Sequence, residues 1–235
     1  NVAELVNGGK TDINITLEKN IDLTGKDWTP IGTDYDNSYK GTFDGGGHTI
    51  TGLTFTTNDE YAGLFGWLNR AGTVKNVVME GVQITSNQIY GGSIGGVVGY
   101  SWGTIENCSV SGSVSGTVYV GGVVGAQIDG SITGCSSSAT VKGTVDVGGV
   151  AGEKWGSMTA CYATGNVTLE IDSPKNLSGG GLVGFNGGSS VLACYATGNV
   201  TSTGSSTGNV HIGGFLGDNY TTVTACYWKN NHEQG

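Results

Sequence analysis

The chain has 235 residues, a formal net charge of −9 and 45 glycines, and only 12% of its residues are charged. Its 19 acidic residues outnumber the 10 basic ones without any basic cluster, which weighs against nucleic acid as a partner. No apolar run approaches the ~18 residues of a membrane-spanning helix, so no membrane insertion by this segment is expected. The length predicts one domain. Because the sequence begins with Asn1 rather than Met, we expect it to be a module of a longer protein.

Residues 1–57 differ from the rest and are predicted to form an N-terminal cap with the opening coils of a stacked fold. Their stretch 13–23 alternates apolar and polar residues, and 43–50 encloses a glycine-rich turn. The open end of a stacked sheet invites aggregation, and a divergent terminal coil is the usual protection. Asp34 and Asp36 lie in an acidic turn that lacks the full ligand set of a calcium-binding loop, so a solvated turn is the simpler interpretation.

Residues 58–235 repeat one pattern six times, which predicts six stacked coils. Each copy has a small pair, two apolar residues, a glycine, a polar loop, and then an apolar residue three places before a cysteine position. The copies follow one another at 26 to 33 residues, a period typical of stacked repeats. They begin at Ala62, Gly95, Gly121, Gly148, Gly180 and Gly213.

The composition favours strands over helices within each copy. Helix formers are scarce, whereas Gly, Thr, Ser and Val are abundant, so we expect three short strands and three corners per copy. This pattern predicts an all-β parallel β-solenoid. The glycine that closes each apolar pair, such as Gly99, Gly125 or Gly184, should need a positive φ or lie where neighbouring coils leave no room for a side chain.

Five cysteines recur nine or ten residues after the last glycine of their copy, while the first copy has Val77 instead. Because residues that recur once per coil stack inside a solenoid, we expect a buried structural ladder of free thiols. Neighbouring Cβ atoms in register lie roughly 4.8 Å apart, beyond the ~3.5–4.5 Å of a disulfide. No metal or cofactor is expected, since no Cys-x-x-Cys pair occurs. The ladder comprises Cys108, Cys135, Cys161, Cys194 and Cys226.

The tetrapeptides Gly-Leu-Phe-Gly at 63–66 and Gly-Leu-Val-Gly at 181–184, with Ala-Cys-Tyr-Ala-Thr-Gly-Asn-Val at 193–200, resemble the GLUG motif family. The resemblance implies a right-handed β-solenoid in secreted or surface-anchored bacterial proteins. These include adhesin-like proteins and metallopeptidases that cleave immunoglobulin A. The resemblance carries no catalytic residue, because the repeat is an architectural unit.

The acidic residues argue against an enzyme, which would need acids and bases gathered on neighbouring coils. We interpret them as scattered, at different offsets in their copies, and therefore expect no catalytic residue. The acidic residues in question are Asp44, Glu80, Glu106, Asp129, Glu153, Asp172 and Asp218. A polysaccharide-active β-helix enzyme stays as an alternative, which two carboxylates about 5–10 Å apart in a cleft would favour.

Aromatic residues form two candidate binding rows. Tyr162, Tyr195 and Tyr227 directly follow cysteines, so their rings should point outward if the cysteines point inward. Exposed rings suit sugars or a protein partner, although ladders of like side chains also stiffen a sheet. The second set follows the glycine motif by one or three residues and comprises Trp67, Tyr100, Trp102, Trp155, Phe185 and Tyr220.

The expected function is that of a non-catalytic extracellular bacterial module, secreted or at the cell surface, with an adhesin-like or spacer role. A host protein, a glycan or neighbouring domains of the same polypeptide are the expected partners. An accessory domain of a secreted immunoglobulin A type metallopeptidase is an alternative. The segments 85–94, 168–179 and 201–212 expand at the same place in the repeat and should project along one edge, as a further candidate surface.

Overall fold

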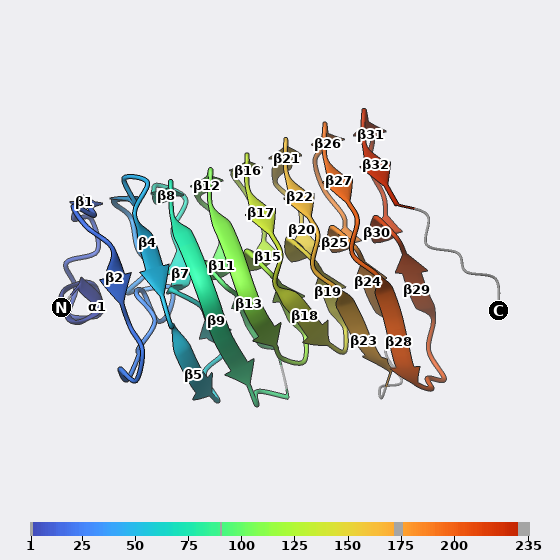
Figure 1. Ribbon diagram of the computed structural model, residues 1–235, viewed down its shortest axis with the longest axis horizontal. Coiled ribbons are helices and arrows are strands. Elements are labelled where there is room, and N and C mark those ends of the chain that lie inside the picture. Colours follow the sequence, from blue (N-terminus) through green and yellow to red (C-terminus); the bar gives the residue numbers. More distant parts are fainter. Residues whose placement is uncertain (1, 90, 172–175, 230–235) are drawn as a thin grey trace.

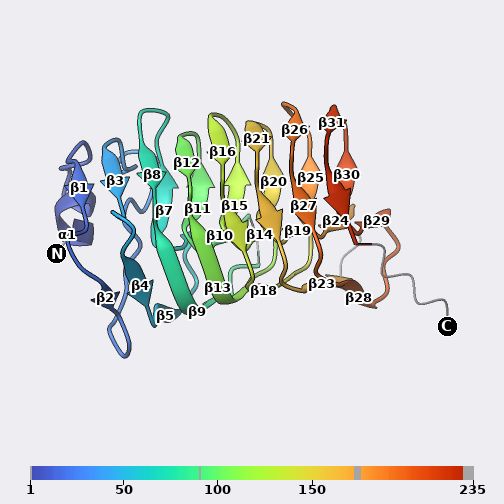
Figure 2. The ribbon, with the colours of Figure 1, turned by 45° about the horizontal axis from the view of Figure 1, so that its top comes forward.

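The computed structural model describes residues 2–89, 91–171 and 176–229 and confirms the predicted all-β parallel β-solenoid, with about seven turns (Figure 1). The coils follow one another in sequence order along the long axis, as Figure 2 also shows. Neighbouring strands pair in parallel and in register. The right-handed sense that the family resemblance implies stays a prediction.

Two of the four sheets lie on either side of the cysteine positions, with sheet A before each cysteine and sheet B after it. Sheet A contains β1 (Ile15–Thr16), β3 (Thr42–Asp44), β8 (Thr73–Lys75), β12 (Thr104–Glu106), β16 (Ser131–Thr133), β21 (Ser157–Thr159), β26 (Val191–Leu192) and β31 (Val223–Thr224). Sheet B contains β2 (Ile21–Asp22), β4 (Thr49–Thr51), β9 (Val78–Ser86), β13 (Ser109–Ser115), β17 (Ser136–Ser137), β22 (Tyr162–Ala163), β27 (Tyr195–Ala196) and β32 (Tyr227–Trp228). Strands β5 (Thr54–Thr57), β18 (Thr140–Gly143), β23 (Val167–Ile171) and β28 (Val200–Gly204) extend sheet B.

The other two sheets lie on either side of the glycine motif. Sheet C contains β7 (Phe65–Leu68), β11 (Val98–Ser101), β15 (Val124–Gln127), β20 (Ala151–Lys154), β25 (Val183–Asn186) and β30 (Leu216–Asn219). Sheet D contains β6 (Tyr61–Ala62), β10 (Ser93–Gly95), β14 (Tyr119–Gly121), β19 (Asp146–Gly148), β24 (Leu177–Gly180) and β29 (Val210–Gly213). Each complete coil therefore visits sheets D, C, A and B, and the expectation of three strands per copy is wrong.

A left-handed backbone bend directly before each cysteine position separates sheet A from sheet B. Gly134 has a φ of 64°, and the non-glycine residues at this bend have φ values between 51° and 54°. These residues are Asn76, Asn107, Ala160, Ala193 and Ala225. The left-handed region costs an L-residue roughly 1–2 kcal/mol, so each alanine here is held by the stacked sheets on either side.

The closing glycines of the motif are required for a different reason. Gly99, Gly125 and Gly184 do not have the positive φ that was one of the two expectations. A Cβ on Gly125 would overlap the backbone nitrogen of Ile94 and lie 2.7 Å from the carbonyl oxygen of Gly99. The glycine column thus allows the strands of sheet C to lie directly against the backbone of sheet D.

The interior is a continuous core of stacked rows. Val74, Ile105, Ile132, Met158 and Val191 pair in register along sheet A and are fully buried. Val223 continues this row but is exposed, because no described coil covers it.

A second interior row is polar and was not predicted. Ser101, Gln127, Lys154 and Asn186 pair in register at the end of sheet C and are fully buried. Lys154 Nζ donates to Asn186 Oδ1 at 2.8 Å and to the carbonyl oxygen of Ser189. Burial lowers the pKa of Lys154 to about 8.

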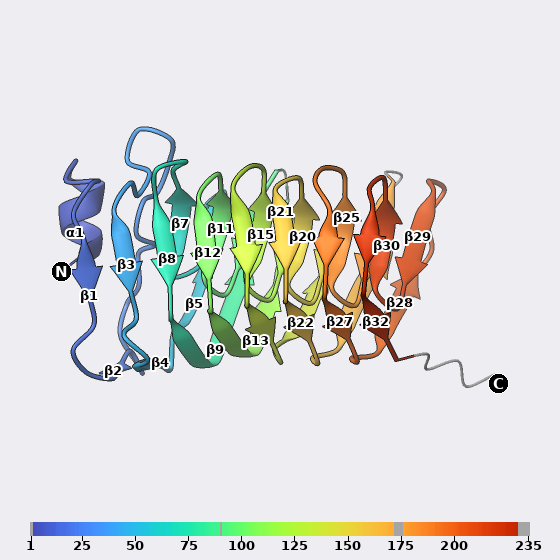
Figure 3. The same cartoon turned by 90° about the horizontal axis from the view of Figure 1, so that it is seen from above.

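The N-terminal segment begins with a helix that the sequence pattern did not predict. Helix α1 (Val2–Asn7) buries Ala3 and Val6 and lies beside β1 at the N-terminal end of the solenoid (Figure 3). Asn7 Nδ2 donates to the carbonyl oxygen of Pro30 at 3.0 Å, and the amide of Gly32 donates to Asn7 Oδ1 at 2.8 Å. The helix therefore covers the first coil and is tied to the second.

Replacing the closing glycine of the central coil should destabilise the fold strongly. In Gly125→Val the new side chain meets backbone atoms on sheets C and D that cannot move independently, so we expect a loss of about 3 kcal/mol or more. Gly179→Ala is the matched control, because its Cβ would lie 3.4 Å from Leu169 and point into the core. Chemical denaturation measures both, and equal stability of the two variants would contradict the packing argument.

Relieving the left-handed bend should stabilise the protein. Ala193→Gly removes a strain of roughly 1–2 kcal/mol and adds about 0.5–1 kcal/mol of chain entropy, so a net gain of roughly 0.5–1 kcal/mol is expected. Gly134→Ala, the reverse change at the same position of another coil, should lose stability and crowd the Asn107 side chain. Changes of the same sign in the two variants would show that φ is not the determining factor.

Candidate functional site

Two outward-facing columns of side chains meet where sheet D turns into sheet C, and we call them together the corner strip. The column on sheet D consists of Tyr61, Ser93, Tyr119, Asp146, Ser178 and His211, paired in register. The column on sheet C consists of Trp67, Tyr100, Ala126, Glu153, Phe185 and Asp218, also in register.

Strand alternation and the glycine column bring the two columns together. Ile94, Val120 and Val147 face the core, so the residues before them on sheet D face outward. Contacts between the columns occur at both ends of the corner strip. The Tyr61 and Trp67 ring centroids lie 4.7 Å apart, and His211 Nδ1 lies 3.0 Å from Asp218 Oδ2.

The facing residues have a simple relation in the sequence that the repeat pattern alone did not reveal. In five of the six coils they are seven positions apart, for example 93 with 100 and 146 with 153, because the glycine motif lies between them. In the sequence, the sheet C column can therefore be recognised as the residue that directly follows the last glycine of each copy. Tyr61, Tyr119 and Asp146 were not predicted, because residue types vary from coil to coil at their position.

The N-terminal half of the corner strip is aromatic. Trp67, Tyr100 and Trp102, three predicted binding residues, gather with Tyr61 and Tyr35, and we call these five residues the aromatic cluster. Trp67 lies 4.5 Å from Tyr100 and 5.8 Å from Trp102, measured between ring centroids. Tyr35 lies 5.9 Å from Trp67 and 5.7 Å from Trp102 and is 57% exposed. Five rings from four segments thus form one connected surface.

Tyr35 comes from the acidic turn considered above for calcium. Asp34 Oδ1 accepts hydrogen bonds from the amide of Asn37 at 3.0 Å and from Asn37 Nδ2 at 3.2 Å. The Asp34 carboxylate therefore closes the turn that presents Tyr35. No group of three or more His, Cys, Asp or Glu side chains within residues 2–89, 91–171 and 176–229 is arranged to hold a metal ion.

The C-terminal half of the corner strip is acidic. Asp146 is only 9% exposed, and burial together with the negative charge of Glu153 raises its pKa to about 7. Burial also raises the pKa of Glu153, whose Oε1 accepts a hydrogen bond from Trp155 Nε1 at 2.8 Å. Two carboxylates with raised pKa values therefore face each other within one coil.

This arrangement corrects the interpretation of the acidic residues as scattered. Glu153 and Asp218 both follow the last glycine of their copy and share one register column, with Phe185 between them. Asp44 and Glu106 likewise share a column on sheet A, with Lys75 between them. Asp172 lies outside the described residues. Glu80 on sheet B and Asp129 in the turn after β15 lie at other positions of the repeat.

The other aromatic residues of the second predicted set lie apart from the aromatic cluster. Trp155, Phe185 and Tyr220 form a separate row, with centroids 5.8 Å and 5.5 Å apart. Ala126 interrupts the column between this row and the aromatic cluster.

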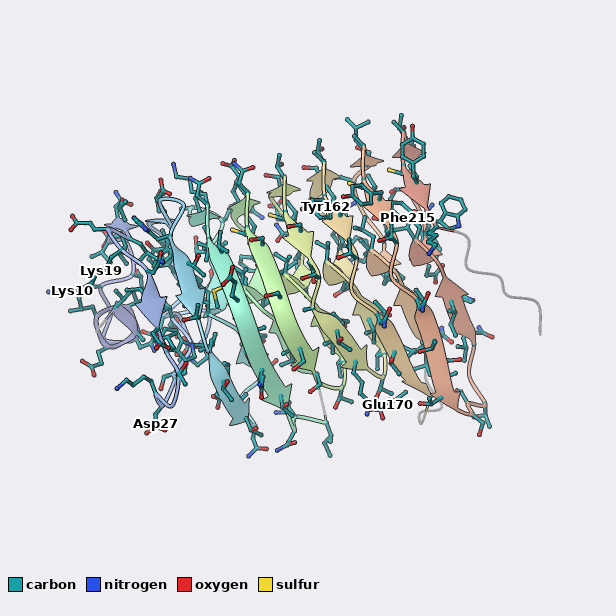
Figure 4. All side chains as sticks on the ribbon, viewed as in Figure 1. Lys10, Lys19, Asp27, Tyr162, Glu170 and Phe215 are labelled. Carbon is teal, nitrogen blue, oxygen red and sulfur yellow. The ribbon has the colours of Figure 1, made fainter. Side chains whose placement is uncertain are left out.

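The predicted tyrosine column lies on the outer face of sheet B, where Figure 4 labels Tyr162. Tyr162, Tyr195 and Tyr227 are 37%, 39% and 71% exposed. The rings of Tyr162 and Tyr195 are parallel within 2° at 4.8 Å, so each covers a face of the other. Stacking of this kind stabilises the sheet and leaves less ring surface for a ligand.

The cysteines form an interior column of free thiols on the opposite side of these tyrosines. Cys108, Cys135, Cys161 and Cys194 are buried, and Cys226 in the last described coil is half-buried. The amide of Cys108 donates to Cys135 Sγ at 3.4 Å, and that of Cys161 donates to Cys194 Sγ at 3.3 Å. A hydrogen bond with Cys135 and burial raise the pKa of Cys161 to about 12, which disfavours thiolate chemistry.

The three long connections lie along the edge where sheet B passes into sheet D. They join β9 to β10, β23 to β24 and β28 to β29, and they include residues 90 and 172–175, which lie outside the described residues. A hollow at this edge is lined by Thr85, Asn87, Lys142 and Glu170 among others. Lys142 Nζ pairs with Glu170 Oε1 at 2.8 Å, and Glu170 is labelled at this edge in Figure 4.

Comparison with known proteins relates these coils to repeats of one type. The model of the GLUG motif matches residues 90–115, 116–142 and 176–201, so the chain carries GLUG-motif repeats. Halomucin of Haloquadratum walsbyi is 38% identical over 120 residues, which are 47% of this chain and 1% of halomucin. A provisionally named Gly-rich membrane protein of Evansella cellulosilytica is 37% identical over 103 residues, 40% of this chain and 12% of that protein.

A solved structure shares the whole fold. The provisionally named immunoglobulin A1 protease of Bacteroides ovatus superposes on this chain with a TM-score of 0.78. The superposition covers 98% of this chain and 73% of the Bacteroides ovatus chain. At 23% identity the likeness shows the fold alone. The chain spans only a small part of the two curated relatives. Across the described residues we find no helix long and apolar enough to span a membrane.

Neutralising Asp146 should change how stability depends on pH. Its folded pKa of about 7 lies above the unfolded value, so the folded state loses stability as pH rises from about 4 to 7, by at most about 4 kcal/mol. Asp146→Asn should therefore stabilise the protein at pH 8 and have little effect at pH 4, as measured by denaturation at both values.

Asp44→Asn is the control of opposite sign. A hydrogen bond from Asn76 Nδ2 at 2.9 Å lowers the pKa of Asp44, so that carboxylate stabilises the fold at neutral pH and loses its effect in acid. If Asp146→Asn destabilised the protein equally at pH 4 and pH 8, the Asp146 carboxyl would not carry the proposed burial penalty.

Proposed function

We propose that this chain, whose coils are GLUG-motif repeats, is a non-catalytic binding module of a larger extracellular protein with an adhesin-like role. The observation that carries the proposal is the aromatic cluster. Its rings lie outside the stacked core, yet Tyr35 reaches over from a separate turn to join them. Aromatic rings gathered on one surface are the usual anchors of a binding site.

The solenoid also suits a spacer role. Sheet A alone stacks eight strands, which at ~4.8 Å per step span about 34 Å along the axis. Each interior column continues without interruption from coil to coil, so the module is expected to be a stiff rod that holds its neighbouring domains apart. The fold likeness to the Bacteroides ovatus protein supports an accessory role in such an enzyme as an alternative setting.

A second candidate function is a polysaccharide-active enzyme, favoured by one observation. Asp146 and Glu153 face each other with raised pKa values, and such carboxylates occur at catalytic sites. Burial alone also raises the pKa of structural carboxylates. Ser178 hydrogen-bonds Asp146, and Trp155 hydrogen-bonds Glu153, so both groups already have structural partners. We therefore prefer the binding function.

A glycan and protein array, combined with a polysaccharide degradation assay, separates these functions. We expect saturable binding without turnover, and binding should fall at least tenfold in a Tyr35→Ala variant. The triple change Tyr162→Ser, Tyr195→Ser and Tyr227→Ser is the matched control, which should retain binding. Turnover that Glu153→Gln abolishes would establish the enzyme instead, and an array without any bound ligand would leave only the spacer role.

A further inference from the structure

Two polar atoms of the corner strip lack a hydrogen-bond partner although they are buried. They are Ser93 Oγ and Trp67 Nε1, and in the described residues only Gln127 Oε1 shares this property. Ser93 is 1% exposed and lies between Tyr61 and Tyr119 in the sheet D column, across from Tyr100. A buried polar group without a partner costs about 1–3 kcal/mol, which a ligand offering a hydroxyl group would remove.

The aromatic cluster supplies an apolar surface directly beside these two atoms. Trp67 belongs to the cluster itself, and Tyr61, the register partner of Ser93, contacts the rings of both Trp67 and Tyr100. A ligand at this place would meet ring faces together with one hydroxyl group and one indole N–H. A saccharide offers that combination, since its C–H face stacks on rings while its hydroxyl groups bond to polar atoms.

Carboxylates beside Tyr61 and Tyr35 favour a ligand without negative charge. Glu60 Oε1 accepts a hydrogen bond from the Tyr61 hydroxyl at 2.6 Å, and Asp34 and Asp36 flank Tyr35 in the sequence. The whole chain carries a net charge of −9. Carboxylate oxygens accept hydrogen bonds from sugar hydroxyls but repel an anionic sugar.

We infer that the aromatic cluster, with Ser93 Oγ and Trp67 Nε1, binds a neutral saccharide. The inference rests on the proposed binding function and adds the ligand class. The saccharide stacks on the exposed Tyr35 ring and the half-buried rings beside it, and its hydroxyl groups form hydrogen bonds with Ser93 Oγ and Trp67 Nε1. Tyr61 and Tyr119, the neighbours of Ser93, must move aside to admit it.

Titration calorimetry with neutral oligosaccharides, namely cello-, xylo-, manno- and malto-oligosaccharides, tests the inference, and an oligogalacturonate serves as the anionic probe. We expect binding of at least one neutral probe and at least tenfold weaker binding of the anionic one. Ser93→Ala should weaken binding about 2- to 13-fold, the worth of one hydrogen bond, and leave the melting temperature unchanged or raised. Trp155→Ala, in the separate aromatic row, should bind normally.

The outcomes distinguish this inference from the proposed function. If a protein ligand from the array binds and all saccharides fail, the saccharide inference is wrong while the binding function stands. Saccharide binding that is unaffected by both Ser93→Ala and Tyr35→Ala would move the site elsewhere and overturn the inference. A Ser93→Ala variant with a lowered melting temperature and unchanged affinity would show that this hydroxyl group serves the fold.

Discussion

Parallel, in-register stacking is the constraint on which the rest of this structure depends. Each residue has as its nearest neighbours the residues at the same position one coil before and one coil after, about 4.8 Å away. Apolar interior side chains therefore pack well against their own kind, as valine, isoleucine and cysteine do. The glycine column is the extreme case, because at Gly125 any Cβ would meet the backbone of two sheets.

Positions that recur once per coil could be predicted from the sequence for this reason. The row before the cysteines stays apolar and five of the six copies keep the cysteine, so their spacing alone places both rows inside a solenoid. The bend that separates sheets A and B could not be predicted in the same way. Ala193 has no residue-type signature for a positive φ, and it adopts one because the strands on either side are already stacked. Helix α1 lies outside the repeat and has no second copy to reveal it.

The corner strip shows why the candidate site was only partly predicted. Trp67 and Tyr100 follow the glycine motif and could be found, but the opposite column varies from Tyr61 to Asp146 to His211. Its position is recognisable only when residues on the two sides of the motif are compared at a separation of seven. The acidic residues Glu153 and Asp218 were wrongly taken as scattered, although both directly follow the last glycine of their copy and therefore share one column of sheet C.

The interior also tolerates change wherever a polar group finds a partner within the coils. Lys154 occupies a position that is leucine, serine or glutamine in earlier coils, and its ammonium group is held by Asn186 and a backbone carbonyl. Outward positions vary still more, because they lie outside the packed interior rows, even where neighbouring side chains bury them as at Ser93 and Asp146. The corner strip uses this freedom to change from aromatic to acidic along its length without any change of backbone. In such a solenoid the chemistry of this outer surface is therefore determined by the outward residues beside the glycine motif, while the motif itself determines only that two columns meet there.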